Sequence, residues 1–260
     1  MHIVDLSTPI DAAYWEPDPI EHRRMSPAEG AVHMSQELRT HLGLDFDPAV
    51  LPDGEFLNND FLTLSAHTGT HVDAPAHYGS RAAYGPPRTV DQLPLDWFVR
   101  PGVRLDLRDA PAGPVGAVDA HYLAKEIARI GYTPQPLDIV LLHTGADERA
   151  GSPEYFSTFV GLTGDAVELL LDLGVRVIGT DAFSLDAPFP HIVATYLATD
   201  DPDVLWPAHF AGRRREYCQI ERLANLGALP VDHGFTVSCL PVKIAGAGAG
   251  WARAVAWLDA

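Results

Sequence analysis

The distribution of apolar and polar residues predicts strands that alternate with helices from about residue 100 onward. Alternating side chains over Gly102–Leu107 predict a half-buried strand, and short apolar runs at Ile139–Leu142 and Val175–Gly179 are typical of fully buried strands. Apolar residues at helical spacing predict a helix over residues 120–130, and Gly131 stands where such a helix would end. Strands that alternate with helices indicate a mixed α/β fold.

Further elements are expected near both ends of the chain. Val4–Pro9 has a pattern typical of a short first strand, and Phe235–Cys239 and Val242–Ile244 are typical of late strands. Asp165 is placed to begin a helix that Gly174 would close. No change in composition marks a domain boundary, so we expect a single domain over residues 1–260.

Residues 11–60 are expected to form an irregular N-terminal arm or lid. Pro17 and Pro19 exclude a helix interior around them, and the rest of the segment has only a weak pattern. A long segment of this kind is either functional or a pair of helices around Met34–Leu42 that the pattern hides. Trp15 could stack on a substrate or only anchor the arm, and both interpretations stay open.

The charge of the chain excludes several classes of partner. There are 35 acidic and 18 basic residues, a formal charge of −17, and 47% of the residues are hydrophobic, enough for a real core. Binding of phosphates needs clustered Lys and Arg, so we expect neither nucleic acid nor an anionic membrane surface as a partner.

Two cysteines are too few for a disulfide framework. No signal peptide or membrane-spanning apolar run is visible, so we expect a cytoplasmic protein that acts on a small molecule.

One short stretch carries the strongest chemical signal. His67, His71, Asp73 and His77 all occupy odd positions, which would place them on one face of a strand. A straight strand would nevertheless hold His67 about 20 Å from Asp73 at ~3.3 Å per residue, too far apart for one ion. The chain must therefore bend within the stretch, and Gly69 and Pro75 are the residues that permit a bend.

This pattern predicts a divalent metal site. Two imidazoles and one carboxylate, from His67, His71 and Asp73, leave positions open for water or substrate, which is typical of catalytic rather than structural sites. His77 is then the candidate general acid and base, because a free histidine titrates near neutral pH. Ordinary surface histidines and a purely structural metal are the less favoured alternatives.

Other candidates are weaker. His209 and Glu221 would be surface residues if taken alone, and His143 suits either a core or a cleft. Asp181 and Asp186 follow a predicted strand, where they could serve a site or cap a helix. The chain has neither a G-x-S-x-G nucleophile motif nor a Walker loop, and its glycine-rich segment near residue 248 does not fit the dinucleotide-binding motif.

The stretch His67–His77 resembles the H-x-G-T-H-x-D-x-P-x-H signature of the metal-dependent cyclase family. That family includes bacterial kynurenine formamidase, isatin hydrolase, trans-dienelactone hydrolase and ring-forming enzymes of aromatic polyketide pathways. Three further segments are similar to family elements: Asp5–Ile10, Gly179–Pro188 and Glu221–Leu226.

The resemblance implies a three-layer β/β/α "swivelling" fold, a homodimer or homotetramer, and Zn²⁺ or Mn²⁺ as cofactor. It implies that His67, His71 and Asp73 are metal ligands and that His77 is the proton shuttle. His209 and Glu221 match positions that hold a second metal or complete the site. Trp15 falls near an N-terminal element that contacts substrate.

Two chemistries fit such a site, and we favour an aromatic polyketide cyclase that closes a ring by intramolecular aldol chemistry. The extended segment 16–60 and the segments 234–244 and 250–256 resemble cyclase members more than the shorter formamidases. The alternative is a metal-dependent hydrolase of an amide, lactone or N-formyl bond, similar to arylformamidase, isatin hydrolase or dienelactone hydrolase. Both chemistries need a Lewis acid beside a carbonyl and a base within reach. A metal-binding or carrier protein without turnover is the third alternative.

Overall fold

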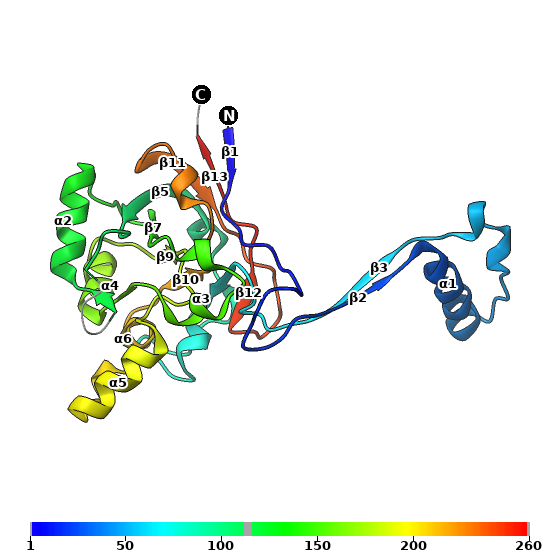
Figure 1. Cartoon of the computed structure of the whole chain (residues 1–260), viewed down its shortest axis with the longest axis horizontal. Helices are drawn as coiled ribbons and strands as arrows, with labels where there is room; N and C mark the ends of the chain where they lie inside the picture. The colour runs from blue at the N-terminus through cyan, green and yellow to red at the C-terminus, as the bar shows by residue number, and fades with distance from the viewer. Residues whose placement is uncertain (1, 112–115, 259–260) are drawn as a thin grey trace. The chain divides into compact units, whose positions relative to one another are not determined.

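The computed structural model describes residues 2–111 and 116–258 (Figure 1). The chain divides into two compact units, which we name the main unit, Met1–Ile10 with Ala66–Ala260, and the arm, Asp11–Ser65. Among the described residues, no helix combines the length and apolar character needed to cross a bilayer.

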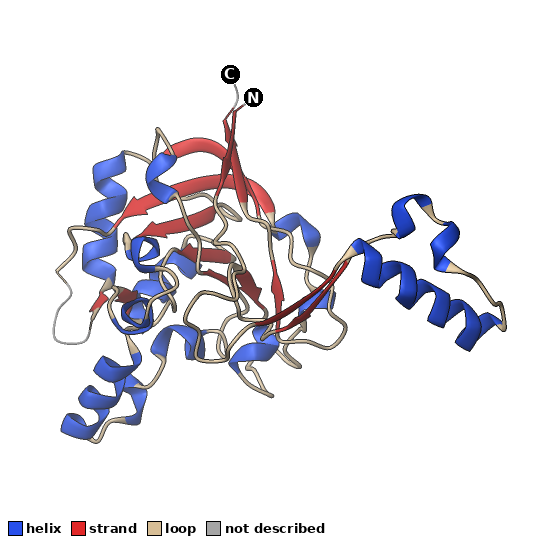
Figure 2. Ribbon diagram, turned by 45° about the vertical axis from the view of Figure 1, so that its right-hand side comes forward, coloured by secondary structure: helices blue, strands red, loops and turns tan. Residues whose placement is uncertain are grey.

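A sheet of nine strands forms the centre of the main unit, and Figure 2 shows that it curls. Its order is β1-β13-β11-β5-β7-β9-β10-β4-β12. The middle strands β5, β7, β9 and β10 run parallel, and the outer pairs are antiparallel. The bounds are β1 (His2–Asp5), β4 (His71–Asp73), β5 (Val99–Asp106), β7 (Ile139–His143), β9 (Val177–Thr180), β10 (Cys218–Glu221), β11 (His233–Ser238), β12 (Ala249–Trp251) and β13 (Val255–Leu258).

The central strand β7 is apolar on both faces because each face of the sheet carries its own core there. Ile139 and Leu141 of β7 belong to one hydrophobic cluster, whereas Val140 and Leu142 belong to the other. Side chains of a strand alternate between faces, so an uninterrupted apolar run fits only a strand that is covered on both sides.

The helices of the main unit begin and end at recognisable residues. The Asp119 side chain accepts a hydrogen bond from the Tyr122 N–H at the start of α2 (Ala120–Ile130), and Gly131 ends it in the left-handed conformation. This helix packs against α4 (Gly164–Asp172), which also contacts α6. The remaining elements are α3 (Pro153–Ser157), α5 (Phe189–Thr199), α6 (Pro207–Ala211), the short ladder of β6 (Ala117–Val118) with β8 (Gly161–Leu162), and the 3₁₀ turns η3 (Pro75–Tyr78), η4 (Val90–Gln92), η5 (Leu95–Trp97), η6 (Ala146–Arg149), η7 (Pro202–Val204) and η8 (Leu226–Ala228).

The predicted mixed α/β class is confirmed, as are the strands near residues 102, 139, 177 and 235 and the helix over 120–130. The predicted strand Val242–Ile244 is wrong, since the Ile244 N–H bonds back to the Val242 carbonyl in a turn. The first strand is shorter than Val4–Pro9 and ends at Asp5. The finer assignment to a three-layer β/β/α fold stays a prediction, as does the single domain over 1–260.

The arm is not irregular, contrary to the prediction for residues 11–60. It contains a hairpin of β2 (Glu21–Met25) with β3 (Asn59–Thr63), the helix α1 (Pro27–Leu42), and the turns η1 (Pro48–Val50) and η2 (Pro52–Gly54). The start of α1 is a capping box: Ser26 accepts from the Glu29 N–H while the Glu29 side chain accepts from the Ser26 N–H. This Ser-Pro-x-Glu signature is in the sequence and could have located the helix.

Candidate metal and catalytic site

The strand β4 places His71 and Asp73 on one face of the sheet. It lies between β10 and β12 and runs antiparallel to both. Glu221 of β10 stands directly opposite His71, while Val72 points to the other side and joins a hydrophobic cluster. Opposed residues of neighbouring strands project to the same face. Strand pairing therefore brings Glu221 to the two motif residues from 150 positions further along the chain.

The turn before β4 brings His67 to the same place. Gly69 has a φ of 65°, in the left-handed region that glycine adopts without strain, and the Gly69 carbonyl lies 2.9 Å from His71 Nδ1. The chain reverses here, so His67 Nδ1 lies 3.0 Å from Asp73 Oδ1 although the two residues are six positions apart. The bend expected at Gly69 is present in the structure.

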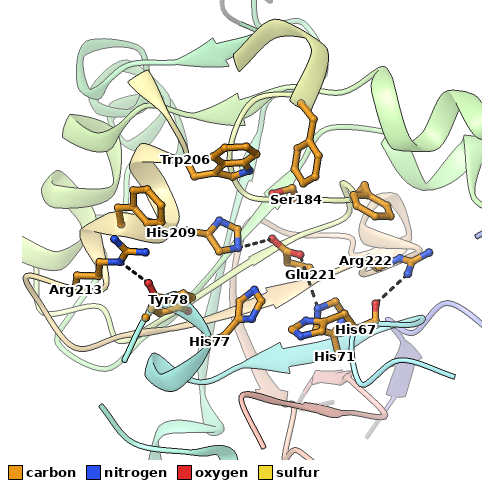
Figure 3. Close-up of a pocket in the computed structure, with 14 residues that line it drawn as sticks. His67, His71, His77, Tyr78, Ser184, Trp206, His209, Arg213, Glu221 and Arg222 are labelled. Atoms are coloured by element: carbon orange, nitrogen blue, oxygen red, sulfur yellow. Dashed lines mark hydrogen bonds and ion pairs between the residues drawn. The ribbon is translucent and has the colours of Figure 1, made fainter. Parts of the chain in front are cut away.

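The ligating atoms form two groups that share Asp73. His71, Asp73 and Glu221 make one group, and His67, Asp73 and His77 make the other, with all ligand atoms of a group within 4.8 Å of one another. His71 Nε2 lies 3.3 Å from Asp73 Oδ1 and 3.8 Å from Glu221 Oε2. The three predicted ligands therefore lie together, and the structure adds Glu221 and His77 to them. Figure 3 shows His67, His71, His77 and Glu221 of this cluster.

Three buried atoms of this cluster lack hydrogen-bond partners among the described residues: His71 Nε2, Asp73 Oδ1 and Asp73 Oδ2. Asp73 is fully buried, and burial of a carboxylate whose oxygens accept no hydrogen bond is costly. Because the Nδ1–H of His71 is directed at the Gly69 carbonyl, the Nε2 lone pair is left for a ligand. The donor set of imidazoles and carboxylates fits a divalent cation such as Zn²⁺ or Mn²⁺.

The charges of neighbouring groups keep Asp73 ionised. Burial alone would raise its pKa, but His71 and His67 hold the pKa of Asp73 well below its usual value. The carboxylate is therefore available as a ligand at neutral pH.

His77 lies on η3 beside the other imidazoles. The centre of its ring is 4.3 Å from that of His67 and 5.6 Å from that of His209. Desolvation within this cluster lowers the pKa of His77 to about 4, although Asp73 opposes the shift. A neutral imidazole in this position can accept a proton.

His209 and Glu221 are not surface residues, contrary to what their sequence context alone suggests. His209 Nε2 lies 3.9 Å from Asp73 Oδ2 and 3.8 Å from Glu221 Oε1. Glu221 Oε1 also accepts a hydrogen bond of 2.9 Å from the Leu185 N–H. Both residues thus complete the wall of the cluster opposite β4.

Asp186 holds His209 in place. Its carboxylate lies 2.5 Å from His209 Nδ1 and accepts hydrogen bonds from the Ala208 and His209 N–H groups at 2.6 Å and 3.0 Å. Asp186 therefore both caps α6 and orients an imidazole, so the two alternatives left open by the sequence are both true. Burial alone would lower the pKa of His209, but Asp186 raises it to about 9. The site thus favours a positive charge on Nε2, either a proton or a cation.

The cluster lies at one end of a cavity of about 350 Å³. Aromatic side chains and two arginines form much of the rest of its wall: Phe183, Phe189, Trp206, Phe210, Arg213 and Arg222. Figure 3 shows Trp206 across from His77, with Arg213 and Arg222 on opposite sides of the histidines. No motif in the sequence marked these residues, although Phe183 lies within the segment similar to the mid-chain element of the family and Phe189 directly follows it.

The other candidates have different positions. Asp181 accepts hydrogen bonds from the Thr144 N–H, the Thr144 hydroxyl and the Gly145 N–H, so it joins two loops. His143 is buried at the end of β7. Trp15 belongs to the arm, where 42% of its surface is exposed. Its contact with substrate stays a prediction.

Solved structures with the same fold identify the structural class. Isatin hydrolase bound to the product analogue thioisatinate aligns with a TM-score of 0.74 at 23% identity, over 99% of this chain and 92% of that chain. A protein described as a "Potential Metal-Dependent Hydrolase With Cyclase Activity" aligns with a TM-score of 0.60 at 21% identity, over 98% of this chain and 96% of that chain. The fold is therefore that of isatin hydrolase, and the His, Asp and Glu cluster lies on its central sheet.

Sequence comparison assigns the family. A family model described as "Putative cyclase" matches residues 4–187. Kynurenine formamidase from Salinibacter ruber is 30% identical over 207 residues, which cover 78% of this chain and 81% of that protein. The chain belongs to this cyclase family, and the resemblance of the His67–His77 signature is confirmed.

Proposed function

We propose that the enzyme hydrolyses an amide, lactone or N-formyl bond of an aromatic compound. The observation that carries the proposal is the buried group of His71, Asp73 and Glu221, whose unpartnered atoms stand at the end of an aromatic cavity. The relatives named above are a formamidase and an isatin hydrolase. They favour hydrolysis over the polyketide aldol chemistry that the sequence favoured.

His67, His71 and Asp73 are the proposed ligands of one cation, and Glu221 with His209 would complete its site or hold a second cation. A divalent cation held there supplies Lewis acidity towards a carbonyl and lowers the pKa of water. The aromatic wall would hold the ring of the substrate and exclude bulk water from the reacting carbonyl.

His77 is the proposed general base. Its imidazole lies beside the proposed ligands His67 and His209, within the cluster where a water would be activated, so its free nitrogen is placed to take a proton from that water. The imidazolium that results can then donate this proton to the leaving nitrogen or oxygen. Asp186 would act through His209 by keeping the Nδ1–H in place and the Nε2 directed at the cluster.

A panel of substrates tests the proposal. The purified protein, loaded with Zn²⁺ or with Mn²⁺, is incubated with N-formylkynurenine, isatin, a dienelactone and a multi-ring polyketide surrogate. Hydrolysis of one of the first three supports the proposal. Conversion of the polyketide surrogate alone would contradict it and restore aldol ring closure.

Elemental analysis of the purified protein tests the cation. One equivalent per chain would leave His209 and Glu221 to complete the site or contact substrate, and two would make them ligands. Asp73→Asn should lower the metal content to a small fraction of that of the parent, whereas the exposed Asp172→Asn should leave it unchanged. Equal metal content in the parent and Asp73→Asn would contradict the ligand assignment.

We also propose that the protein is a homo-oligomer in which a second copy covers the arm. Large apolar side chains of the arm are exposed, among them Leu42, Leu44, Val50, Leu57 and Leu62. The arm has 55 residues by its bounds, and few of its side chains are buried. A segment of this size with so little core needs a partner surface to be stable.

A further inference from the structure

We propose that Arg213 binds an anionic group of the substrate, so that the enzyme selects aromatic amides, lactones or N-formyl compounds that carry a carboxylate. The inference rests on the proposed hydrolase function and names the substrate class of the same cavity. Arg213 follows α6 and lines the cavity that the metal cluster closes at its other end.

Three features hold the guanidinium of Arg213 in place. Its Nε–H donates a hydrogen bond to the Tyr78 carbonyl, and its Cζ lies 3.7 Å from the centre of the Phe210 ring. Gly79, with a φ of 153°, makes room for it, since a Cβ at that position would lie 2.9 Å from Arg213 Nε. A side chain held in this way binds a ligand with little further loss of conformational entropy.

The terminal amino groups of Arg213 have no hydrogen-bond or ion-pair partner within residues 2–111 and 116–258. The next two arginines differ in this respect, because Arg214 pairs with Glu168 at 3.0 Å and Arg215 with Asp172 at 2.5 Å. Arg213 is exposed and lines the cavity, so these donors are open to a ligand that enters it. A guanidinium binds a carboxylate through paired hydrogen bonds, so an anionic group of a ligand suits this position.

The layout of the cavity places the anion away from the reacting bond. Figure 3 shows Arg213 on one side of His77 and His209, with His67 and His71 on the other. Asp73 and Glu221 would repel an anion, but a divalent cation beside them offsets their two charges. The second arginine of the wall, Arg222, donates from Nη1 to the His67 carbonyl at 3.0 Å and so stands at the metal end. A substrate would thus direct its carbonyl at the cluster and its carboxylate at Arg213.

Kinetics with a matched pair of substrates test the inference. The pair is 4-formamidobenzoate and formanilide, which differ only in the ring carboxylate. The parent enzyme should prefer the carboxylate in kcat/KM. Arg213→Met should raise KM for 4-formamidobenzoate about 10- to 100-fold with little change in kcat, and should leave formanilide unchanged. Arg213→Lys should restore part of the preference, and Arg214→Met, whose partner lies on α4, should change neither substrate.

Gly79→Ala provides a second variant because it displaces the guanidinium without removing it. We expect it to raise KM for the carboxylate only, by less than Arg213→Met does. Equal losses for both substrates in Arg213→Met would overturn the inference and indicate a structural role. So would a parent enzyme that does not distinguish the pair.

Calorimetry with benzoate and benzamide on the metal-loaded protein separates this inference from the proposed function. If no substrate is turned over, the hydrolase proposal fails, but loss of benzoate affinity in Arg213→Met and not in Arg214→Met still supports an anion site. Benzoate binding that Arg213→Met leaves unchanged would place the carboxylate elsewhere and overturn the inference.

Discussion

At the scale of the residue, His77 differs from its neighbours because it is the imidazole of the signature that lies on η3 rather than on the turn or strand before it. It is also a member of one of the two candidate ligand groups, so its role as base or as ligand needs a direct test. Substitution of His77 would release the metal if the residue is a ligand, but not if it is a general base.

We expect His77→Ala to lower kcat by about 10²- to 10⁴-fold while the metal content stays that of the parent. The reason is that removal of a general base slows proton transfer but leaves His67, His71 and Asp73 in place. We would measure kcat with the best substrate of the panel and the metal content by elemental analysis of the same preparation. A parallel loss of metal and activity would show that His77 is a ligand.

A second residue-scale prediction concerns His143, which is 5% exposed and whose Nδ1 has no hydrogen-bond partner among the described residues. Burial and the nearby Arg108 lower the pKa of His143. The unfolded chain then binds more protons than the folded one, so stability is present above about pH 6.5 and is lost as the pH falls below it.

We expect His143→Leu to lose less free energy of unfolding than the parent between pH 7.5 and pH 5.5. Urea denaturation at both pH values measures the difference. The exposed His121→Leu on α2 serves as control and should follow the parent. An unchanged pH dependence in His143→Leu would mean that this histidine is not held neutral by the fold.

At the scale of the element, the site depends on how α6 is joined to the loop before α5. Asp186, in that loop, forms hydrogen bonds with two N–H groups of α6 and with His209 Nδ1. The loop can therefore not move without moving an imidazole of the cluster. Asp186 is fully buried, so the joint is also part of the core of the main unit.

We expect Asp186→Asn to lower metal affinity or activity about 10- to 100-fold, as loss of the partner of a ligating imidazole generally does. The amide keeps only one acceptor oxygen, so its NH₂ group faces one of the N–H donors that the carboxylate accepts from, and the substitution removes the charge that favours a cation at His209. Metal titration and kcat report the loss. Circular dichroism should show an intact fold, and unchanged metal affinity and kcat would contradict the positioning role of Asp186.

The pattern of apolar and polar residues predicts some helices and strands and misses others. The helix α2 follows from its spacing, Asp119 and Gly131, because each signal is local. The three-residue strands β4 and β12 have no such signal, since they are defined by the strands beside them. The prediction for Val242–Ile244 was wrong for this reason: the residues are strand-like, but only the Val242 N–H bonds to β12, through the Trp251 carbonyl, and the Ile244 N–H bonds back to Val242.

At the scale of the whole molecule, the exposed apolar residues of the arm make the proposed homo-oligomer testable. We expect Leu57→Asp to lower the mass of the oligomer in solution, because a charge placed in a buried contact is costly. Sedimentation equilibrium measures the mass. The neighbouring exposed Glu55→Gln should leave it unchanged, and a parent protein that sediments as a monomer would contradict the proposed oligomer.

The sequence by itself determined the family, the class of fold and the signature His67–His77, because these depend on residues close together in the chain. The family resemblance already implied that His209 and Glu221 complete the site, whereas only the tertiary structure showed that Asp186 joins them and that Arg213 faces the same cavity. Their spacing along the chain contains no trace of this, since pairing of β10 with β4 and docking of α6 through Asp186 bring them together. Contacts between distant segments are made by packing, and a local pattern cannot encode them.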